Sequence, residues 1–352
     1  MKIQNKVRKN RSSKRKVNVA VVGLGFMGTV HIRAYQQIPQ ARIVALCAHQ
    51  RIPVHGVLAD ISGNPASAGG INLGKDIKVY RRLEDLLGDP DVDLVDICLP
   101  TSLHVPQAVA ALRAGKHVVC EKPLARTSAE AREILAAART GRRFFMPAMC
   151  MRFWPGWAWL KELKTKKTYG KILAARFRRV SGPPGWGRDR YFKGGHSGGA
   201  LLDLHIHDAD FVQFLFGRPT SVFSTGRSRY SGAVDHVVTQ YRVPGGVTVY
   251  AEGSWLMTHG FSMSYTVIFE RATLDYDSTR GAEALRLDEE GKRSRFVPCS
   301  GTGYVGELRH MIDSILTNRQ PTIITGQDGL SAVEICEAEE RSVRTRKEIL
   351  LR

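Results

Sequence analysis

The sequence predicts an α/β protein of two domains: an N-terminal doubly wound parallel sheet, then a C-terminal α+β domain with an open, mostly antiparallel sheet. Three observations support this. Between residues 17 and 142, apolar strands alternate with helices of roughly 10–15 residues, the pattern of βαβ crossovers. From about Phe144 the segments become longer and richer in β-forming residues. The length of 352 residues also exceeds what one core usually supports, about 250–300 residues.

The first domain opens with the apolar run Val17–Val22, which is typical of a strand buried on both faces of a parallel sheet. A helix should follow to about Ile38, where Pro39 stops it. The stretch from Pro53 to Gly74 lacks periodicity and is predicted to be a surface excursion. The other expected elements are the strand Arg42–Ala48, a strand near Val79, a helix through Leu83–Leu87, the strand Leu94–Leu99, a helix from about His104 to Ala114, the strand His117–Cys120 and the helix Ser128–Arg139.

The second domain should be rich in strands, with Pro244-Gly245-Gly246 as a hairpin turn between two of them. Its expected elements are the strands Ile172–Val180, Ser221–Tyr230, Val234–Val243, Val247–Trp255 and Ser264–Phe269, and the helices Leu204–Phe216 and Val305–Thr317. A closing helix, Gln327–Lys347, should pack at the domain junction. The expected parts are therefore a basic tail (1–16), the parallel-sheet domain (17–142), the α+β domain (143–326) and the C-terminal helix segment (327–352).

The composition is that of a folded protein, with 43% hydrophobic and 24% charged residues. No apolar run approaches the roughly 20 residues that cross a bilayer, and no signal sequence follows the basic start, which predicts a cytoplasmic protein. The net charge is +19, and residues 1–16 carry Lys and Arg but no acid. Because no aromatic residue interleaves these charges, we expect a disordered, solvated tail rather than a nucleic-acid contact. The six cysteines are scattered, which predicts reduced thiols.

The turn Gly23-x-Gly25-x-x-Gly28 lies between the first strand and its helix, a context in which this pattern predicts dinucleotide binding. Gly23 permits a tight turn, Gly25 lets the backbone approach a pyrophosphate, and Gly28 allows the helix to pack closely on the strand. The helix N-terminus also offers unpaired N–H groups to the anion. Phe26 and Met27 belong to the same turn and are expected to contact the cofactor.

The end of the second strand affects the choice between NAD(H) and NADP(H). A fold selective for NAD usually has Asp or Glu here to bind the ribose 2′-hydroxyl, whereas this chain has Ala48. Arg51, helped by His49 or Gln50, could pair with a 2′-phosphate. The sequence therefore favours NADP(H); NAD(H) is the alternative if Arg51 is only a solvated loop residue.

Two segments follow parallel strands at their carboxyl ends, where ligands bind in this architecture. They are Leu99-Pro100-Thr101-Ser102-Leu103-His104 and Cys120-Glu121-Lys122-Pro123. Lys122 could hydrogen-bond a substrate hydroxyl and stabilise a developing alkoxide. We therefore treat Lys122 as a candidate catalytic residue.

In the second domain, Asp203 and His207 are four residues apart on a predicted helix and so share one face. A histidine that titrates near neutrality can remove a hydroxyl proton while a hydride leaves the same carbon. Asp203 could orient this histidine or bind substrate. The nearby His205 suggests a metal site as an alternative, but residues two apart on a helix do not face each other, so we expect no metal.

Together these motifs resemble the Gfo/Idh/MocA family, the group of glucose-fructose oxidoreductase and inositol dehydrogenase. The resemblance rests on Gly23-x-Gly25-x-x-Gly28, Glu121-Lys122-Pro123, and Gly198-Gly199-Ala200-Leu201-Leu202-Asp203 with His207, and it covers nearly all of residues 17–347. It implies a Rossmann dinucleotide-binding domain over 17–142. It also implies that residues 143–326 bind a small sugar-like substrate and form a homodimer or homotetramer through the open sheet.

The resemblance also implies roles for individual residues. Lys122, Asp203 and His207 match the family's catalytic residues, with His207 as acid/base and Lys122 holding nicotinamide and substrate. Positions that usually line the cofactor are matched by Pro100, Thr101, His104 and Glu121. Arg152 lies in a segment, Met151-Arg152-Phe153, that matches one passing the nicotinamide, which makes it a candidate for substrate contact. The implied reaction is NAD(P)-dependent hydride transfer to or from a carbinol carbon of a sugar, sugar acid or cyclitol.

The chain departs from the family pattern at two places. Ala48 replaces the usual carboxylate, and Arg190-Tyr191 stands where members often have Trp-Arg or Trp-Phe, which makes both residues candidates for substrate contact. The surrounding region is strongly basic, which suggests an anionic substrate such as a sugar acid, with a solvated sheet face as the alternative. The basic residues are Arg176, Arg178, Arg179, Arg188, Arg190 and Lys193.

Two other functions stay open at this stage. Some relatives use transient oxidation and a bound NAD(H) to cleave a glycosidic bond. The chain could also be a non-catalytic NADP-binding regulator that reaches nucleic acid through its tail. The presence of Lys122, Asp203 and His207 together argues against the regulator, because a sensor has no need of an acid/base histidine.

Overall fold

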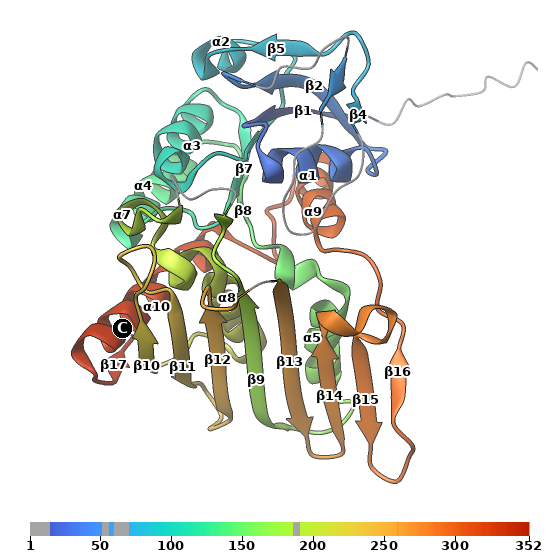
Figure 1. Cartoon of the computed structure of the whole chain (residues 1–352). Helices are drawn as coiled ribbons and strands as arrows, with labels where there is room; N and C mark the ends of the chain where they lie inside the picture. The colour runs from blue at the N-terminus through green and yellow to red at the C-terminus, as the bar shows by residue number, and fades with distance from the viewer. Residues whose placement is uncertain (1–14, 51–55, 60–69, 186–190, 259, 352) are drawn as a thin grey trace, which may run out of the picture.

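The structure, a computed structural model, describes residues 15–50, 56–59, 70–185, 191–258 and 260–351. It confirms the predicted α/β fold, in which a parallel-sheet domain lies against a second domain with a larger, mostly antiparallel sheet (Figure 1). Within these residues, no helix has the length and apolar character needed to cross a bilayer.

The first sheet has six parallel strands in the order β5-β2-β1-β6-β7-β8. The strands are β1 (Val17–Val22), β2 (Ala41–Cys47), β5 (Lys78–Tyr80), β6 (Leu94–Ile97), β7 (His117–Glu121) and β8 (Phe145–Ala148). Its helices are α1 (Phe26–Tyr35), α2 (Leu83–Leu87), α3 (His104–Arg113) and α4 (Ser128–Thr140), and the short strands β3 (Val57–Leu58) and β4 (Ile71–Asn72) pair beside it. The central strands are buried, as their continuous apolar sequence predicts.

Strand β8 extends the first sheet beyond residue 142, where the sequence predicts the domain boundary. It pairs in parallel with β7, with Phe145 opposite Val118. All four of its residues are buried, and such a short run has no alternation by which a sequence pattern could assign it to one domain or the other.

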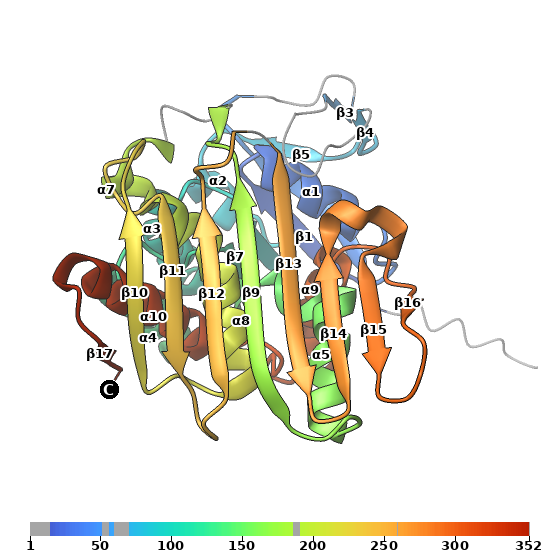
Figure 2. The same cartoon turned by 60° about the horizontal axis from the view of Figure 1, so that its bottom comes forward.

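The second sheet has nine strands in the order β16-β15-β14-β13-β9-β12-β11-β10-β17, and only β9 and β12 pair in parallel. The strands are β9 (Ile172–Ser181), β10 (Ser221–Arg227), β11 (His236–Arg242), β12 (Thr248–Ser254), β13 (Phe261–Phe269), β14 (Ala272–Asp277), β15 (Leu285–Glu289), β16 (Arg295–Val297) and β17 (Ile349–Leu350). Figure 2 shows this sheet with its helices behind it, so that one face is covered and the other is open. The covering helices are α5 (Pro155–Lys166), α8 (Ile206–Phe216) and α10 (Gly326–Thr345).

The last two long helices bind the domains together. Helix α9 (Tyr304–Thr317) packs against α1, and α10 packs against both α4 and α8. At the α10 contact the Ser128 N–H donates to Glu337 at 2.7 Å. These contacts hold the second domain against the edge of the first sheet where the parallel strands end, which is where ligands bind in this architecture.

Candidate active site

A cavity of about 1220 Å³ lies between the two domains. The first domain contributes the glycine turn and the loops after β6 and β7, and the second contributes β9, the short helix α7 (Gly194–Ser197) and the start of α8. The volume exceeds the roughly 300–1,000 Å³ of common small-molecule sites, so it has room for a dinucleotide and a substrate together.

The glycine turn has the geometry that its sequence predicts. Gly23 has a φ of 93°, which favours glycine, and a Cβ on Gly28 would overlap the carbonyl oxygen of Gly23. Gly25 caps α1 without a side-chain bond, and a Cβ there would meet nothing within 4 Å. Gly25, Phe26 and Met27 line the cavity, so the unpaired N–H groups at the start of α1 are available to an anion.

Charges of both signs lie near the end of β2. Ala48 is partly buried, and Arg51 lies outside the described residues, so its predicted contact is not placed. Sequence reasoning missed Arg81, whose Nη1 donates to the carbonyl of His49 at 2.7 Å. Burial, followed by the carboxylates of α2, raises the pKa of Cys47 to about 11. The guanidinium of Arg81 and the carboxylates of α2 therefore lie near the end of β2.

Lys122 and Asp203 meet across the domain boundary. Lys122 directly follows β7, and its Nζ lies 2.6 Å from the backbone oxygen and 3.1 Å from Oδ1 of Asp203. Asp203 belongs to a π-helical turn, Leu201–His205, that precedes α8. Both residues line the cavity, where the ammonium group is within reach of a bound oxygen.

His207 lies in the first turn of α8 and lines the same cavity. Its Nδ1 is buried and has no hydrogen-bond partner among the described residues. Burial, and then the positive charges of Lys122 and Arg179, lower the pKa of His207 well below the usual 6.5. The imidazole is therefore neutral at neutral pH and able to accept a proton.

Buried polar and ionisable groups hold the Glu121 carboxylate in place. Glu121 Oε2 accepts from the Lys122 N–H at 3.0 Å, and Oε1 lies 3.1 Å from His31 Nε2. The other ring nitrogen of His31 lies 2.8 Å from Asp96. Burial alone would lower the pKa of His31, but Asp96 and then Cys98 raise it well above its ordinary value. The ligand-type atoms of His31, Asp96 and Cys98 lie within 4.8 Å of one another, and their mutual bonds account for that proximity.

Only part of the loop after β6 lines the cavity. Pro100 and Thr101, which the resemblance places beside the cofactor, line the cavity. His104 does not: it is buried, with Nδ1 2.7 Å from the Pro123 oxygen and Nε2 2.7 Å from the Leu99 oxygen. The sequence-based expectation of a cofactor contact is corrected here, because the ring lies between the two strand-end loops and ties them together.

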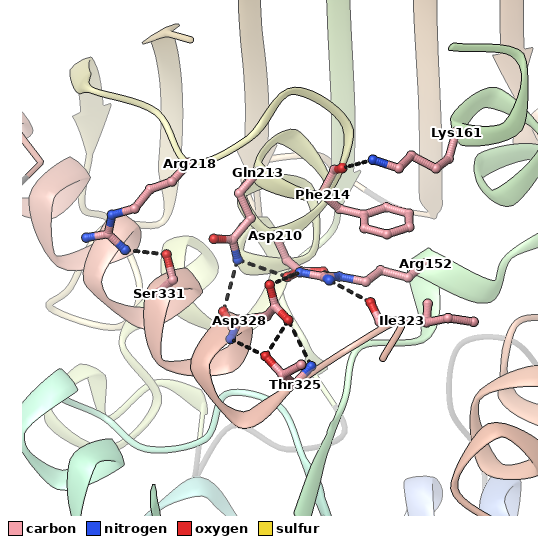
Figure 3. A network of polar contacts seen from close by, with 10 residues as sticks. All are labelled: Arg152, Lys161, Asp210, Gln213, Phe214, Arg218, Ile323, Thr325, Asp328 and Ser331. Atoms are coloured by element: carbon pink, nitrogen blue, oxygen red, sulfur yellow. Dashed lines mark hydrogen bonds and ion pairs between the residues drawn. The ribbon is translucent and has the colours of Figure 1, made fainter. Parts of the chain in front are cut away.

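Arg152 also lies elsewhere than the sequence suggests (Figure 3). Its Nε and Nη2 donate to Asp210 at 2.9 and 2.6 Å, and its Nη1 donates to the Ile323 oxygen at 2.7 Å. The side chain is buried beneath the cavity wall, so the expected substrate contact is corrected to a structural ion pair. The cavity is lined instead by the neighbouring Met151 and Trp154.

The basic region before the glycine pair divides between the two faces of the sheet. Arg176 is exposed and Arg178 pairs with Glu252, whereas Arg179 points inward and lines the cavity. Lys193 lines the cavity as well. Arg188 and Arg190 lie outside the described residues.

Aromatic side chains form part of the cavity wall. Tyr191, a predicted substrate residue, meets the ring of Trp255 edge-on at 5.9 Å. Trp154 and Tyr304 form a second edge-on pair at 5.8 Å. Apart from Tyr191, sequence reasoning missed these residues, because they come from separate segments and carry no local motif.

The other polar residues near His207 do not share its site. His205 is buried, with Nε2 3.0 Å from the Tyr241 hydroxyl and 3.3 Å from Glu339. Asp208 binds Arg179, as described below. His205 and His207 therefore point to different surroundings, which removes the basis for a shared metal site between them.

Two family profiles match the chain. One, described as an oxidoreductase family with an NAD-binding Rossmann fold, covers residues 17–148. The other, described as the GFO/IDH/MocA C-terminal domain, covers residues 157–275.

Curated relatives and solved structures agree with these profiles. The myo-inositol 2-dehydrogenase of Thermotoga maritima is 26% identical over 95% of this chain and 98% of its own length. The levoglucosan dehydrogenase of Pseudarthrobacter phenanthrenivorans is 32% identical over 58% of this chain and 53% of its own. A solved levoglucosan dehydrogenase in complex with NADH has a TM-score of 0.80 at 20% identity, covering 96% of this chain and 100% of that one, which shows a shared fold.

Proposed function

The chain belongs to the GFO/IDH/MocA oxidoreductase family, and we propose that it transfers a hydride between a nicotinamide cofactor and a carbinol carbon of a sugar, sugar acid or cyclitol. One observation carries the proposal. Lys122, Asp203 and His207 line one cavity together with the glycine turn at the start of α1. The names of the relatives, dehydrogenases of myo-inositol and of levoglucosan, support a polyhydroxylated substrate.

The described residues fit a nicotinamide dinucleotide. The space that a Cβ on Gly28 would fill is taken by the Gly23 carbonyl, so α1 lies close to the turn and its first N–H groups face the cavity. Gly25, Phe26 and Thr101 would hold the cofactor there. When bound, the oxidised cofactor supplies a hydride acceptor.

The protein's own residues then stabilise the carbinol oxygen and accept the hydroxyl proton. The Lys122 ammonium donates a hydrogen bond to the carbinol oxygen and stabilises the negative charge that develops on it. Neutral His207 accepts the hydroxyl proton as the hydride leaves the carbon, and it returns a proton in the reverse direction. Asp203 holds Lys122 in place through the contacts described above.

We keep NADP(H) as the proposed cofactor, with NAD(H) as the alternative. Ala48 supports this because it supplies no carboxylate to repel a 2′-phosphate, and Arg81 adds a guanidinium beside the strand end. A fluorescence titration with NADPH and NADH, on the wild type and on Arg51→Ala, tests the choice. Tighter NADPH binding that Arg51→Ala weakens supports it, and equal or tighter NADH binding contradicts it.

We also propose that the open face of the second sheet joins copies of the chain into a homodimer or homotetramer. Large apolar side chains are exposed on outward positions of its strands. They include Leu173, Phe223, Tyr250 and Ile268. An exposed apolar surface of this kind is typical of an interface.

The proposed activity is tested by incubating the protein with NADP⁺ or NAD⁺ and a panel of sugars, sugar acids and cyclitols, and following the absorbance of reduced nicotinamide. Reduction with at least one compound class supports the proposal. Cleavage of a glycoside without net nucleotide turnover identifies the glycosidase chemistry instead, and failure to bind either nucleotide contradicts the proposal altogether.

A further inference from the structure

Arg179 is a buried arginine that lines the cavity. It lies on the inner face of β9, and its side chain is only 3% exposed. Its Nε donates to Asp208 at 2.9 Å and its Nη2 at 3.2 Å. The positive charge of Arg179 contributes to lowering the pKa of His207, so Arg179 lies near the proposed acid/base residue.

One end of this guanidinium has no oxygen partner. Nη1 lies 3.3 Å from the Met263 sulfur, which is a weak acceptor, and no oxygen of the described residues accepts a hydrogen bond from it. A buried N–H group without an oxygen acceptor costs about 1–3 kcal/mol, and more when it is charged. Arg179 and Met263 both line the cavity, so an oxygen of a bound molecule can supply the missing acceptor.

One cationic side chain of the described cavity wall has no ionic partner. Arg179 and Asp208 neutralise each other, and Lys193, which also lines the cavity, has no ion-pair partner within the described ranges. The carboxylates on the described cavity wall are Glu121 and Asp203, and both are already bound to other groups. A single unpaired ammonium group matches a carboxylate better than a phosphate ester, which carries about −1.5 to −2 at neutral pH.

The electrostatic surroundings of His207 also favour a substrate with a negatively charged group. Lys122 and Arg179 both lower its pKa, and an oxidised nicotinamide adds a further positive charge. A negative group beside Arg179 offsets part of this effect and raises the pKa of His207 towards neutrality. A base whose pKa is closer to the working pH accepts the proton more effectively.

We propose that the substrate is a sugar acid whose carboxylate is bound by Nη1 of Arg179 and by Lys193, while its carbinol group meets Lys122 and His207. This inference rests on the proposed function. In the reaction the carbinol C–H bond breaks and the hydride passes to the oxidised cofactor. The hydroxyl proton passes to His207 and the carbon becomes a carbonyl, so atoms and electrons balance.

The test compares matched compounds: glucuronate with glucose, galacturonate with galactose, and gluconate with glucitol, with glucose 6-phosphate as a phosphate control. We expect kcat/KM to be at least tenfold higher for the carboxylated member, since one hydrogen bond to a charged group contributes about 1.5–3 kcal/mol. Equal activity on acid and neutral partners, or preference for the phosphate, overturns the inference. If no compound of any class is oxidised, the proposed function itself fails, which is a different result.

Substitutions identify which residues cause the preference for carboxylated compounds. Arg179→Lys keeps a cation beside Asp208 but loses the planar fork, and Lys193→Gln changes an exposed side chain, so its fold should be unaffected. Each should lower the acid-to-neutral ratio of kcat/KM about tenfold. The matched control is Arg178→Lys, one residue along on the outer face, which should leave the ratio unchanged. The assignment is contradicted if the acid-to-neutral ratio of kcat/KM stays unchanged in both Arg179→Lys and Lys193→Gln. It is also contradicted if Lys193→Gln weakens only the affinity for the cofactor.

Discussion

Replacing Arg152 with alanine should destabilise the fold without removing a substrate contact. The side chains of Arg152 and Asp210 are 3% and 1% exposed, and two hydrogen bonds of 2.9 and 2.6 Å join them. The Ile323 carbonyl would also lose its donor. Removing one partner of a buried pair leaves the other charge uncompensated, which costs about 3–5 kcal/mol.

The assay is equilibrium urea unfolding followed by tryptophan fluorescence, with kcat/KM measured on the same preparation under conditions where the variant is folded. The free energy of unfolding should fall by about 3–5 kcal/mol, while the KM for substrate stays close to the wild-type value. Arg218→Ala is the matched control from the same region, because Arg218 is 34% exposed and its pair with Glu334 should contribute no more than about 1 kcal/mol.

A double variant, Arg152→Met with Asp210→Leu, separates the ion pair from the space it fills. Apolar residues of similar volume often replace a buried pair with little loss, so most of the stability should return. If Arg152→Ala instead unfolds like the wild type and raises the KM for substrate, the ion-pair interpretation is wrong and Arg152 contacts substrate after all.

Three further predictions concern the cofactor turn, the proposed base and the open sheet. Gly28→Ala should weaken NADPH binding at least tenfold in a fluorescence titration and lower stability, whereas Gly25→Ala should weaken binding alone; equal effects of the two would contradict the geometry. Because burial and nearby cations lower the pKa of His207, kcat/KM for oxidation should be level through pH 6.5 and fall only in more acid solution; an inflection above 6.5 would refute this. Phe223→Glu with Tyr250→Glu should lower the mass measured by light scattering towards that of a monomer, and an unchanged mass would show that this face is not the interface.

The sequence predicted the fold class because its evidence is local. The strand Val17–Val22 and the turn after it are contiguous, and their apolar run and glycines need no distant partner to be recognised. Lys122 and His207 were found for a similar reason, since a strand end and a helix start each fix where a side chain projects.

The misplaced residues depend on partners far along the chain. Arg152 binds Asp210 and the Ile323 carbonyl, and His104 lies between two loops, and no local pattern encodes either contact. Arg178 and Arg179 are different, because side chains alternate along a strand and their opposite faces follow from that period of two. The alternation of side chains along β9 therefore distinguishes these two arginines, whereas the basic composition of the region does not.

The most direct test of the proposed mechanism compares cofactor reduction by the wild type with that by His207→Asn at saturating substrate and NADP⁺ or NAD⁺. Loss of a general base typically lowers the rate about 10²–10⁴-fold. The account predicts a kcat at least one-hundredfold lower for His207→Asn, with NADPH affinity unchanged in a fluorescence titration. A variant that binds the cofactor normally and reduces it at the wild-type rate would contradict the assignment of His207 as the acid/base of this cavity.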